Sequence, residues 1–163
     1  MLPKELSNGI CSLNPDEVRL TFSALVTLKL SGEIEGFRFV KSYIRSRVKG
    51  VYADINTILD GSASPEILKK YNQLLPQIHL MQQLAQILRK RRFDRGAMNI
   101  SSNESKFIIE DGKIKDIVPR PTGESERMIE EFMLTANQAA ATLAIEQELP
   151  FIYRVHDRPQ AIK

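Results

Sequence analysis

A stretch of regular alternation over residues 18–30 limits the fold more than any other feature of this sequence. Every second residue in it is apolar: Val18, Leu20, Phe22, Ala24, Val26, Leu28 and Leu30. Because successive side chains of a strand point to opposite faces of a sheet, this pattern predicts a long strand with one face on a hydrophobic core. Ser31 to Gly36 has the composition of a turn, and the aromatic and β-branched stretch from Phe37 to Ser46 predicts a second, antiparallel strand.

Helical periodicity accounts for much of the remaining chain. Tyr52, Ile55, Ile58 and Leu59 share one helical face, and Asp60-Gly61 is expected to end that helix. Ser64-Pro65 is typical of a helix N-cap followed by a proline in the first turn. A second apolar repeat runs from Leu74 to Leu88, and Pro76 is expected to break or restart it. The last helix is expected from about Ser125 to Gln147.

Two further β elements complete the predicted organisation. Residues 106–119 predict a hairpin, because Asp111-Gly112 lies between two apolar β segments. Residues 150–156 predict a short final strand that is cut off before its fold is complete. The sequence therefore predicts a single α+β domain over residues 1–163, with an antiparallel or mixed β-sheet and flanking helices.

Composition narrows the class of protein. Apolar residues make up 42% of the chain and charged residues 26%, as in soluble globular proteins. No apolar run approaches the roughly 18 residues that a bilayer crossing needs, so we expect no membrane span. Cys11, the single cysteine, has no partner for an internal disulfide or a CxxC zinc site. A reducing, cytoplasmic location is the simplest expectation.

The distribution of charge gives a weak indication of a nucleic-acid partner. The net charge is +3, and the isoelectric point is about 9.0. Arg45, Arg47 and Lys49 alternate in one segment, and five cations gather in residues 89–95. The second cluster also has the composition of a helix C-terminus, where cations complement the helix dipole. Both interpretations can hold together.

Four stretches of the chain carry a family resemblance. They are MLPKELSNGICSL (1–13), YIRSRVKGVYADI (43–55), the 92–107 region with Arg95-Gly96 and ESKF, and MIEEFMLTAN (128–137) with PFIYRVHDRP (150–159). In order and spacing they resemble the catalytic RNB domain of the ribonuclease R and ribonuclease II family of bacterial 3′-to-5′ exoribonucleases. Ribonuclease R is the more similar of the two. The resemblance spans essentially the whole chain and implies an incomplete, central part of that domain.

The resemblance implies hydrolysis of single-stranded RNA from its 3′ end to nucleoside 5′-monophosphates. In that family a cluster of aspartates holds Mg²⁺, which activates water. The seven aspartates here are scattered, so we expect this chain to begin downstream of the metal site, to hold no Mg²⁺ and to be inactive alone. The alternative is a non-catalytic α+β RNA-binding or scaffold module that only shares ancestry. An aspartate cluster encoded upstream in the same reading frame would separate the two.

Two residues are candidates for the catalytic site. Tyr52 matches the family's tyrosine near the terminal nucleotide, and Glu130 matches the first glutamate of a pair that helps recognise ribose. A carboxylate can accept a hydrogen bond from the 2′-hydroxyl that DNA lacks. We expect both side chains to face a common groove. The plainer alternatives are an amphipathic tyrosine at a helix start and an acid favoured by the helix dipole.

Helix geometry supports Glu130 independently of the resemblance. The predicted buried stripe of the last helix contains Ile129, Phe132, Met133, Ala136, Ala140 and Leu143. Glu130 and Asn137 border this stripe, whereas Glu131 is expected to point away from it. Asn137 could equally be a satisfied polar group of the helix.

One family position departs from the pattern. Ile100 stands where family members commonly carry an aromatic residue that clamps the stacked bases, each stack contributing about 1–3 kcal/mol. Either the alignment slips there or the clamp is looser. The candidate RNA contacts are therefore Tyr52, Ile100, Glu130, Asn137, Arg45 and Arg47. A chain without its flanking strands is also expected to expose apolar edges and to self-associate.

Overall fold

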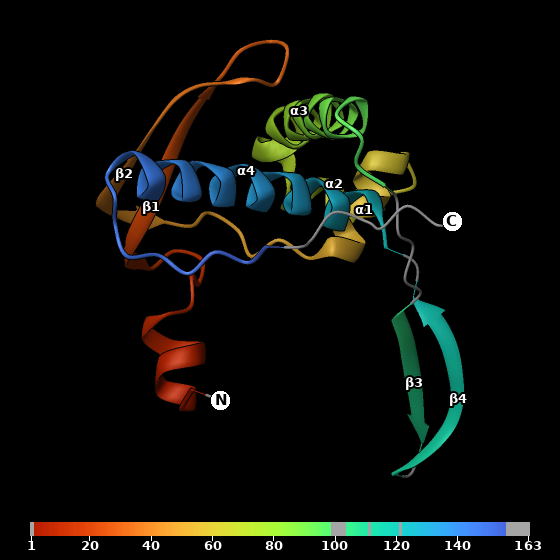
Figure 1. Ribbon diagram of the computed structural model, residues 1–163. Coiled ribbons are helices and arrows are strands. Elements are labelled where there is room, and N and C mark those ends of the chain that lie inside the picture. Colours follow the sequence, from red (N-terminus) through yellow and green to blue (C-terminus); the bar gives the residue numbers. More distant parts are fainter. Residues whose placement is uncertain (1, 99–103, 111, 121, 156–163) are drawn as a thin grey trace, which may run out of the picture.

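A computed structural model describes residues 2–98, 104–110, 112–120 and 122–155. The elements follow in the order η1 (Glu5–Ile10), β1 (Val18–Leu28), β2 (Ile34–Arg45), α1 (Tyr52–Asp60), α2 (Pro65–Lys70), η2 (Asn72–Leu74), α3 (Leu75–Asp94), β3 (Glu104–Glu110), β4 (Lys113–Arg120) and α4 (Glu124–Glu146). Helices α1 to α4 form the body, the β1–β2 ribbon lies at one end of it, and the β3–β4 hairpin projects beyond the other (Figure 1). The predicted α+β class, with antiparallel strands and flanking helices, is confirmed.

The β1–β2 ribbon confirms the alternating strand but not its burial. The strands pair antiparallel from Val18↔Arg45 to Thr27↔Gly36, with a register shift after Thr27. Helix α4 packs against β1, yet Leu20 is 88% exposed and Phe22 and Tyr43 are also exposed. The prediction that the whole apolar face lies on a core is therefore wrong for this half of the ribbon. No element in the described part of the chain covers Leu20, Phe22 and Tyr43.

The opposite face of the ribbon carries a cluster of hydroxyl groups that bond to one another. The hydroxyl groups of Thr21 and Ser42 lie 2.8 Å apart, and those of Ser23 and Ser42 lie 2.7 Å apart. Thr21 and Ser42 are a directly opposed cross-strand pair, and such hydroxyl pairs stabilise antiparallel strands. The ribbon therefore has a hydrogen-bonded hydroxyl cluster on one face, while its other, apolar face remains partly open.

The helix boundaries follow the local sequence signals. Ser64 caps α2, since its Oγ accepts a hydrogen bond from the Ile67 backbone N–H at 3.4 Å. Pro76 lies in the first turn of α3, where a missing N–H costs nothing, so the predicted restart is confirmed.

The predicted strand at 150–156 is wrong over residues 150–155, which have no strand assignment because they pair with no described strand. His156 lies outside the described residues. No helix within the described ranges is long and apolar enough to cross a membrane.

Tyr71 is the centre of the small core and fixes the start of α1. It packs with Ile58 and Ile78 and is almost fully buried. Its hydroxyl donates a hydrogen bond to Asp54 Oδ2 at 2.9 Å and accepts one from the Val51 backbone N–H at 3.2 Å. The hydrogen bonds from Lys70 and Tyr71 to Asp54 lower the pKa of that carboxyl group. Because the buried Tyr71 bonds to Val51, the residue just before α1, it fixes the position of Tyr52, the first residue of α1.

The N-terminus of helix α4 lies against α1, and a side chain of α1 caps it. Its N-cap residue, Gly123, has no side chain to cap the helix, and the Asn56 Oδ1 accepts a hydrogen bond from the Ser125 N–H at 2.9 Å. Asn56 also donates to Glu126 Oε2 at 3.0 Å. A Cβ on Gly123 would overlap the Asn56 amide, so this approach requires glycine. An otherwise unpaired N–H of the first turn is satisfied in this way.

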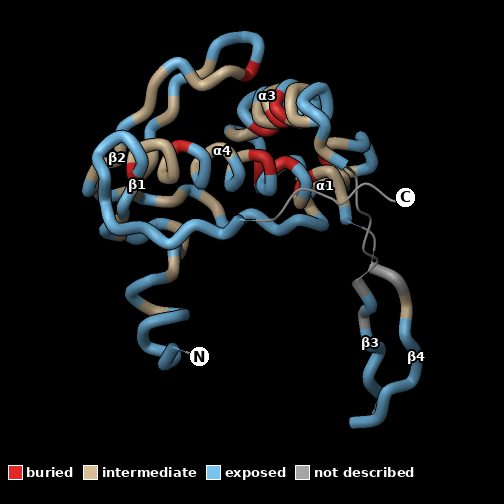
Figure 2. The backbone as a smooth tube through the Cα atoms, in the orientation of Figure 1, coloured by how far each residue is buried: buried red, intermediate tan, exposed pale blue. Residues whose placement is uncertain are grey.

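The β3–β4 hairpin confirms the signal from Asp111-Gly112. The two strands pair antiparallel, with Phe107 opposite Ile117, while Asp111 itself lies outside the described residues. The hairpin projects away from the helices, and the residues of it that Figure 2 colours by burial are nearly all exposed. Its stability therefore depends on pairing between its own strands rather than on the helical core.

Candidate functional site

The C-terminal part of α3 and the first half of α4 are joined by a buried ion pair. Arg92 Nη2 lies 2.6 Å from Glu131 Oε1, and Arg92 Nε lies 3.1 and 3.3 Å from the two carboxylate oxygens. Glu131 is 4% exposed. These hydrogen bonds raise the pKa of the Arg92 guanidinium, which stays charged. A fork of this kind is strong and fixes the relative orientation of the two side chains.

The burial of Glu131 corrects the predicted face of α4. The residues of α4 that are buried are Ser125, Met128, Glu131, Ala139 and Ala144. Met133, expected in the buried stripe, is 53% exposed, and Ile129 is also exposed. Apolar periodicity alone cannot locate a carboxylate that is buried because a cation on the neighbouring helix neutralises it.

A second fork holds the same two helices together. Arg89 Nη2 and Nη1 donate to the two carboxylate oxygens of Glu124 at 2.6 and 3.3 Å. Glu124 lies in the first turn of α4, where a negative charge also complements the helix dipole. Two cations of the 89–95 cluster therefore serve helix packing. Neither Glu124 nor Glu131 was identified as a site residue from the sequence. A signal was available: two arginines three residues apart on α3 match two glutamates seven residues apart on α4.

The two candidate catalytic residues are exposed and lie on helices that contact each other. Tyr52 opens α1, and its backbone carbonyl accepts a hydrogen bond from the Ser125 hydroxyl at 3.2 Å. Glu130 lies one turn further along α4, with its Oε1 3.7 Å from Arg92 Nη2. Both side chains are accessible to solvent. No hydrogen bond or ion pair in the described part of the chain joins them, so their common groove stays a prediction.

The other candidate RNA contacts are dispersed. Arg45 ends β2 and lies 3.7 Å from an Asp16 carboxylate oxygen, and Arg47 follows it in an exposed segment. Asn137 is exposed on α4. Ile100 lies outside the described residues, so its assignment to the aromatic clamp stays a prediction.

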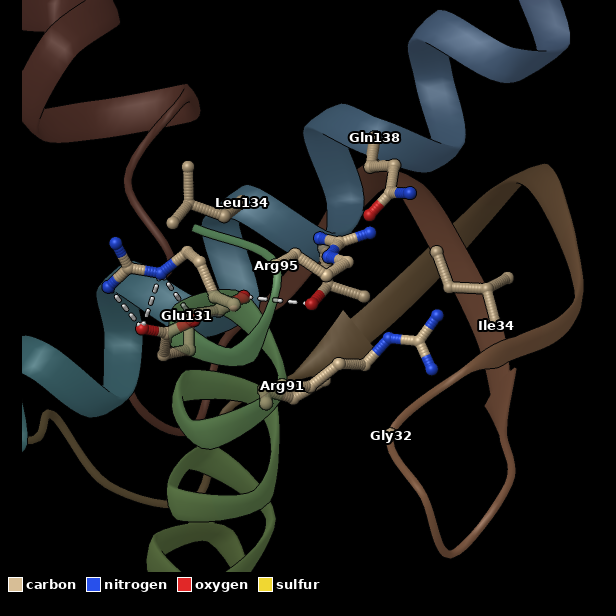
Figure 3. A pocket seen from close by; sticks show the side chains of 10 residues that line it. Gly32, Ile34, Arg91, Arg95, Glu131, Leu134 and Gln138 are labelled. Atoms are coloured by element: carbon tan, nitrogen blue, oxygen red, sulfur yellow. Dashed lines mark hydrogen bonds and ion pairs between the residues drawn. The ribbon is translucent and has the colours of Figure 1, made fainter. Parts of the chain in front are cut away.

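A pocket opens where the tip of the ribbon meets α3 and α4. It has a volume of about 50 Å³. Gly32 and Ile34 line it from the ribbon, Arg91 and the C-cap residue Arg95 from the end of α3, and Gln138 from α4 (Figure 3). Gly32 has a φ of 77°, and a Cβ there would lie 3.1 Å from Ile87 Cγ2, so the close approach of the tip to α3 depends on glycine. Neither Tyr52 nor Glu130 lines this pocket.

Comparison with known proteins identifies the family. The RNB domain matches residues 1–163, the whole chain. The chain belongs to the RNB domain family. Ribonuclease R of Thermotoga maritima is 40% identical over 161 residues, which cover 98% of this chain and 22% of the relative. Ribonuclease R 1 of Lactococcus lactis is 38% identical over 99% of this chain and 20% of its own length. The RNB chain thus spans about a fifth of the curated relatives it matches.

A solved structure shows the same fold. The apo form of Mycoplasma genitalium RNase R superposes with a TM-score of 0.88 over 97% of this RNB chain and 24% of that protein, at 24% identity. The resemblance that the four sequence stretches indicated is therefore confirmed for family and fold.

The possible metal ligands of the described residues are scattered. Within residues 2–98, 104–110, 112–120 and 122–155, no group of three or more histidine, cysteine, aspartate or glutamate side chains is placed to hold a metal ion. Hard divalent cations such as Mg²⁺ are bound through one or more carboxylates. The part of this RNB chain that the structure describes brings no three such ligands together.

Proposed function

We propose that this chain is the central part of one catalytic domain in a magnesium-dependent 3′-to-5′ exoribonuclease, which hydrolyses single-stranded RNA to nucleoside 5′-monophosphates. The observation that carries the proposal is the RNB match over the whole chain, with relatives named ribonuclease R of which it spans about a fifth. M. genitalium RNase R, which shares the fold, is known in complex with ribose-methylated single-stranded RNA. RNA turnover and a single free cysteine, Cys11, favour the cytoplasm.

Within this proposal the chain supplies part of the wall that recognises the RNA end. Glu130 accepts a hydrogen bond from the 2′-hydroxyl of a ribose. The Arg92 guanidinium, 3.7 Å away and anchored by Glu131, orients that carboxylate. Tyr52 offers its ring edge and phenol to the terminal nucleotide from the start of α1. Magnesium, bound elsewhere in the enzyme, would supply the activated water.

The proposal predicts that activity depends on sequence outside these residues. The isolated chain should release no nucleotides from a uniformly labelled single-stranded RNA in the presence of Mg²⁺. A chimera, in which this chain replaces the homologous 161-residue segment of T. maritima ribonuclease R, should release nucleoside 5′-monophosphates. Product analysis by thin-layer chromatography measures both.

Two outcomes would contradict the proposal. Magnesium-dependent hydrolysis by the isolated chain would show that it carries its own metal site. A chimera that folds and binds RNA without hydrolysing it would instead favour the non-catalytic RNA-binding or scaffold module.

We also propose that the isolated chain self-associates through the open face of the ribbon. Leu20, Phe22 and Tyr43 form an exposed apolar patch there, and such patches on two-stranded edges promote association. Sedimentation velocity should show dimers or larger species whose fraction rises with concentration, and Leu20→Lys should reduce it. The matched control is Leu30→Lys, since Leu30 is equally exposed but lies in the turn beyond β1. A chain that stays monomeric at high concentration would contradict this.

A further inference from the structure

The pocket at the ribbon tip contains cations that have no partner among the described residues. Arg89 and Arg92 are committed to Glu124 and Glu131. Arg91 lies in the last turn of α3 and Arg95 is its C-cap residue. Their guanidinium groups form no hydrogen bond or ion pair within the described part of the chain. The nearest acidic neighbour on the ribbon, Glu33, forms an ion pair with Lys29 at 3.0 Å. Its pKa is lowered first by Lys29 and only slightly by Arg91.

The geometry of these two arginines suits an anion. Arg91 lies in the last turn of α3 and Arg95 is the C-cap residue of that helix, so both side chains project from the same end of α3. Their guanidinium groups extend to the same side, toward Ile34 and Gln138 and away from the Arg92–Glu131 pair (Figure 3). The Gln138 amide adds a neutral donor beside them. Guanidinium groups have donors only, so a ligand must bring several acceptor oxygens.

The charge within the pocket is strongly unbalanced. Its lining includes three arginines and a single acid, Glu131. Glu131 is already fully engaged by the fork from Arg92. Arg95 is exposed and Arg91 is partly exposed, so both guanidinium groups are accessible to a negatively charged ligand.

The position of the pocket indicates which anion it takes. Arg92 both lines the pocket and lies 3.7 Å from Glu130. A strand whose ribose reaches Glu130 would place a neighbouring phosphate group close to the pocket. We propose that Arg91, Arg95 and Gln138 form a binding site for a backbone phosphodiester of single-stranded RNA. This inference rests on the proposed function, because it takes RNA as the partner.

The site can be tested by the salt dependence of RNA binding. Fluorescence anisotropy with a 5′-labelled decauridylate measures Kd for the full 163-residue chain between about 50 and 200 mM salt. Arg91→Gln and Arg95→Gln should each weaken binding by about 3- to 10-fold. The double variant should reduce the slope of log K against log salt by about 0.7, the value expected when the protein neutralises one phosphate fewer on a single strand. Gln138→Ala should weaken binding without changing the slope.

Matched variants separate a phosphate contact from a general change in charge or stability. Lys90→Gln removes the same charge from α3, but Lys90 is exposed, pairs with Asp94 and does not line the pocket. It should leave both Kd and slope near the wild-type values. Arg91→Lys with Arg95→Lys keeps both charges and should retain the slope, which keeps the test valid if the glutamine variants fail to fold.

Competitors distinguish the source of the phosphate. An abasic phosphodiester oligomer should displace the labelled RNA, whereas inorganic phosphate at the same phosphate concentration should not. Displacement by inorganic phosphate alone would overturn the inference in favour of a free-phosphate site. An unchanged slope in the double glutamine variant would overturn the inference and leave the proposed function standing. A wild-type chain that binds no RNA would overturn both.

Discussion

Arg92→Ala is expected to lower the free energy of unfolding by about 3 kcal/mol. The substitution leaves the Glu131 carboxylate buried, at 4% exposure, without the guanidinium that neutralises it. Removing one partner of a buried ion pair costs about 3–5 kcal/mol, because the remaining charge has lost its solvation by water and by its partner. The lower end applies here, since the Arg92 side chain is 29% exposed and water can enter the space it leaves.

A comparison of the single variant with a double variant that also removes the Glu131 charge identifies the cause of this loss. Chemical denaturation should show that Arg92→Ala and Arg92→Ala/Glu131→Leu differ, with the double variant recovering part of the stability because no buried charge remains. Lys90→Ala, which breaks the exposed Lys90–Asp94 pair on the same helix, should change stability by less than about 0.5 kcal/mol. If Arg92→Ala were as mild as Lys90→Ala, the ion pair would contribute nothing to the joint between α3 and α4.

Glu130→Ala is expected to reduce the preference for RNA over DNA by about 10- to 100-fold. A hydrogen bond to a charged group contributes about 1.5–3 kcal/mol, and every 1.4 kcal/mol corresponds to a factor of ten. Glu130 is exposed and its Oε1 lies 3.7 Å from the Arg92 guanidinium, so its carboxylate is accessible to a 2′-hydroxyl. The ratio of kcat/KM for RNA and DNA oligonucleotides of the same sequence, measured in the T. maritima chimera, checks this.

The control for Glu130 lies at the other end of the same helix. Glu146→Ala removes an exposed acid from the last turn of α4, where a negative charge opposes the helix dipole. It should leave the ratio unchanged. An unchanged ratio in Glu130→Ala as well would mean that Glu130 is only an acid favoured by the first turns of the helix. If the chimera does not fold, the ratio of Kd values for RNA and DNA on the isolated chain provides the same comparison.

The elements of this fold that could be predicted are those whose signals lie within a few residues. The alternation from Val18 to Leu28 indicated β1, Asp111-Gly112 indicated the hairpin, and Ser64-Pro65 indicated the start of α2. Each of these signals works through backbone geometry, which neighbours along the chain determine. The strand expected at 150–156 is absent from residues 150–155 for the converse reason. A strand needs a partner, which the local sequence does not supply.

Burial was the property that local patterns could not supply. Leu20 has the pattern of a core residue and is exposed, while Glu131 has the pattern of a surface acid and is buried. Which face of a helix or strand is buried depends on the segment that packs against it. Glu131 of α4, for example, is buried where Arg92 of α3 faces it. The family resemblance found the candidates Tyr52 and Glu130 but not the pocket. The lining of the pocket comes from three separate segments, residues 32–34, 88–95 and 131–138.

The cap that Asn56 provides for α4 has a consequence for how the chain acquires its structure. The hydrogen bond from Ser125 to Asn56 connects residues 69 positions apart, so the first turn of α4 is completed only after a long loop has closed. Loop closure of this length costs entropy before the contact returns any stabilisation, and non-local contacts of this kind slow folding. The β3–β4 hairpin forms within that loop from local pairing alone, so it can be in place before the helices dock.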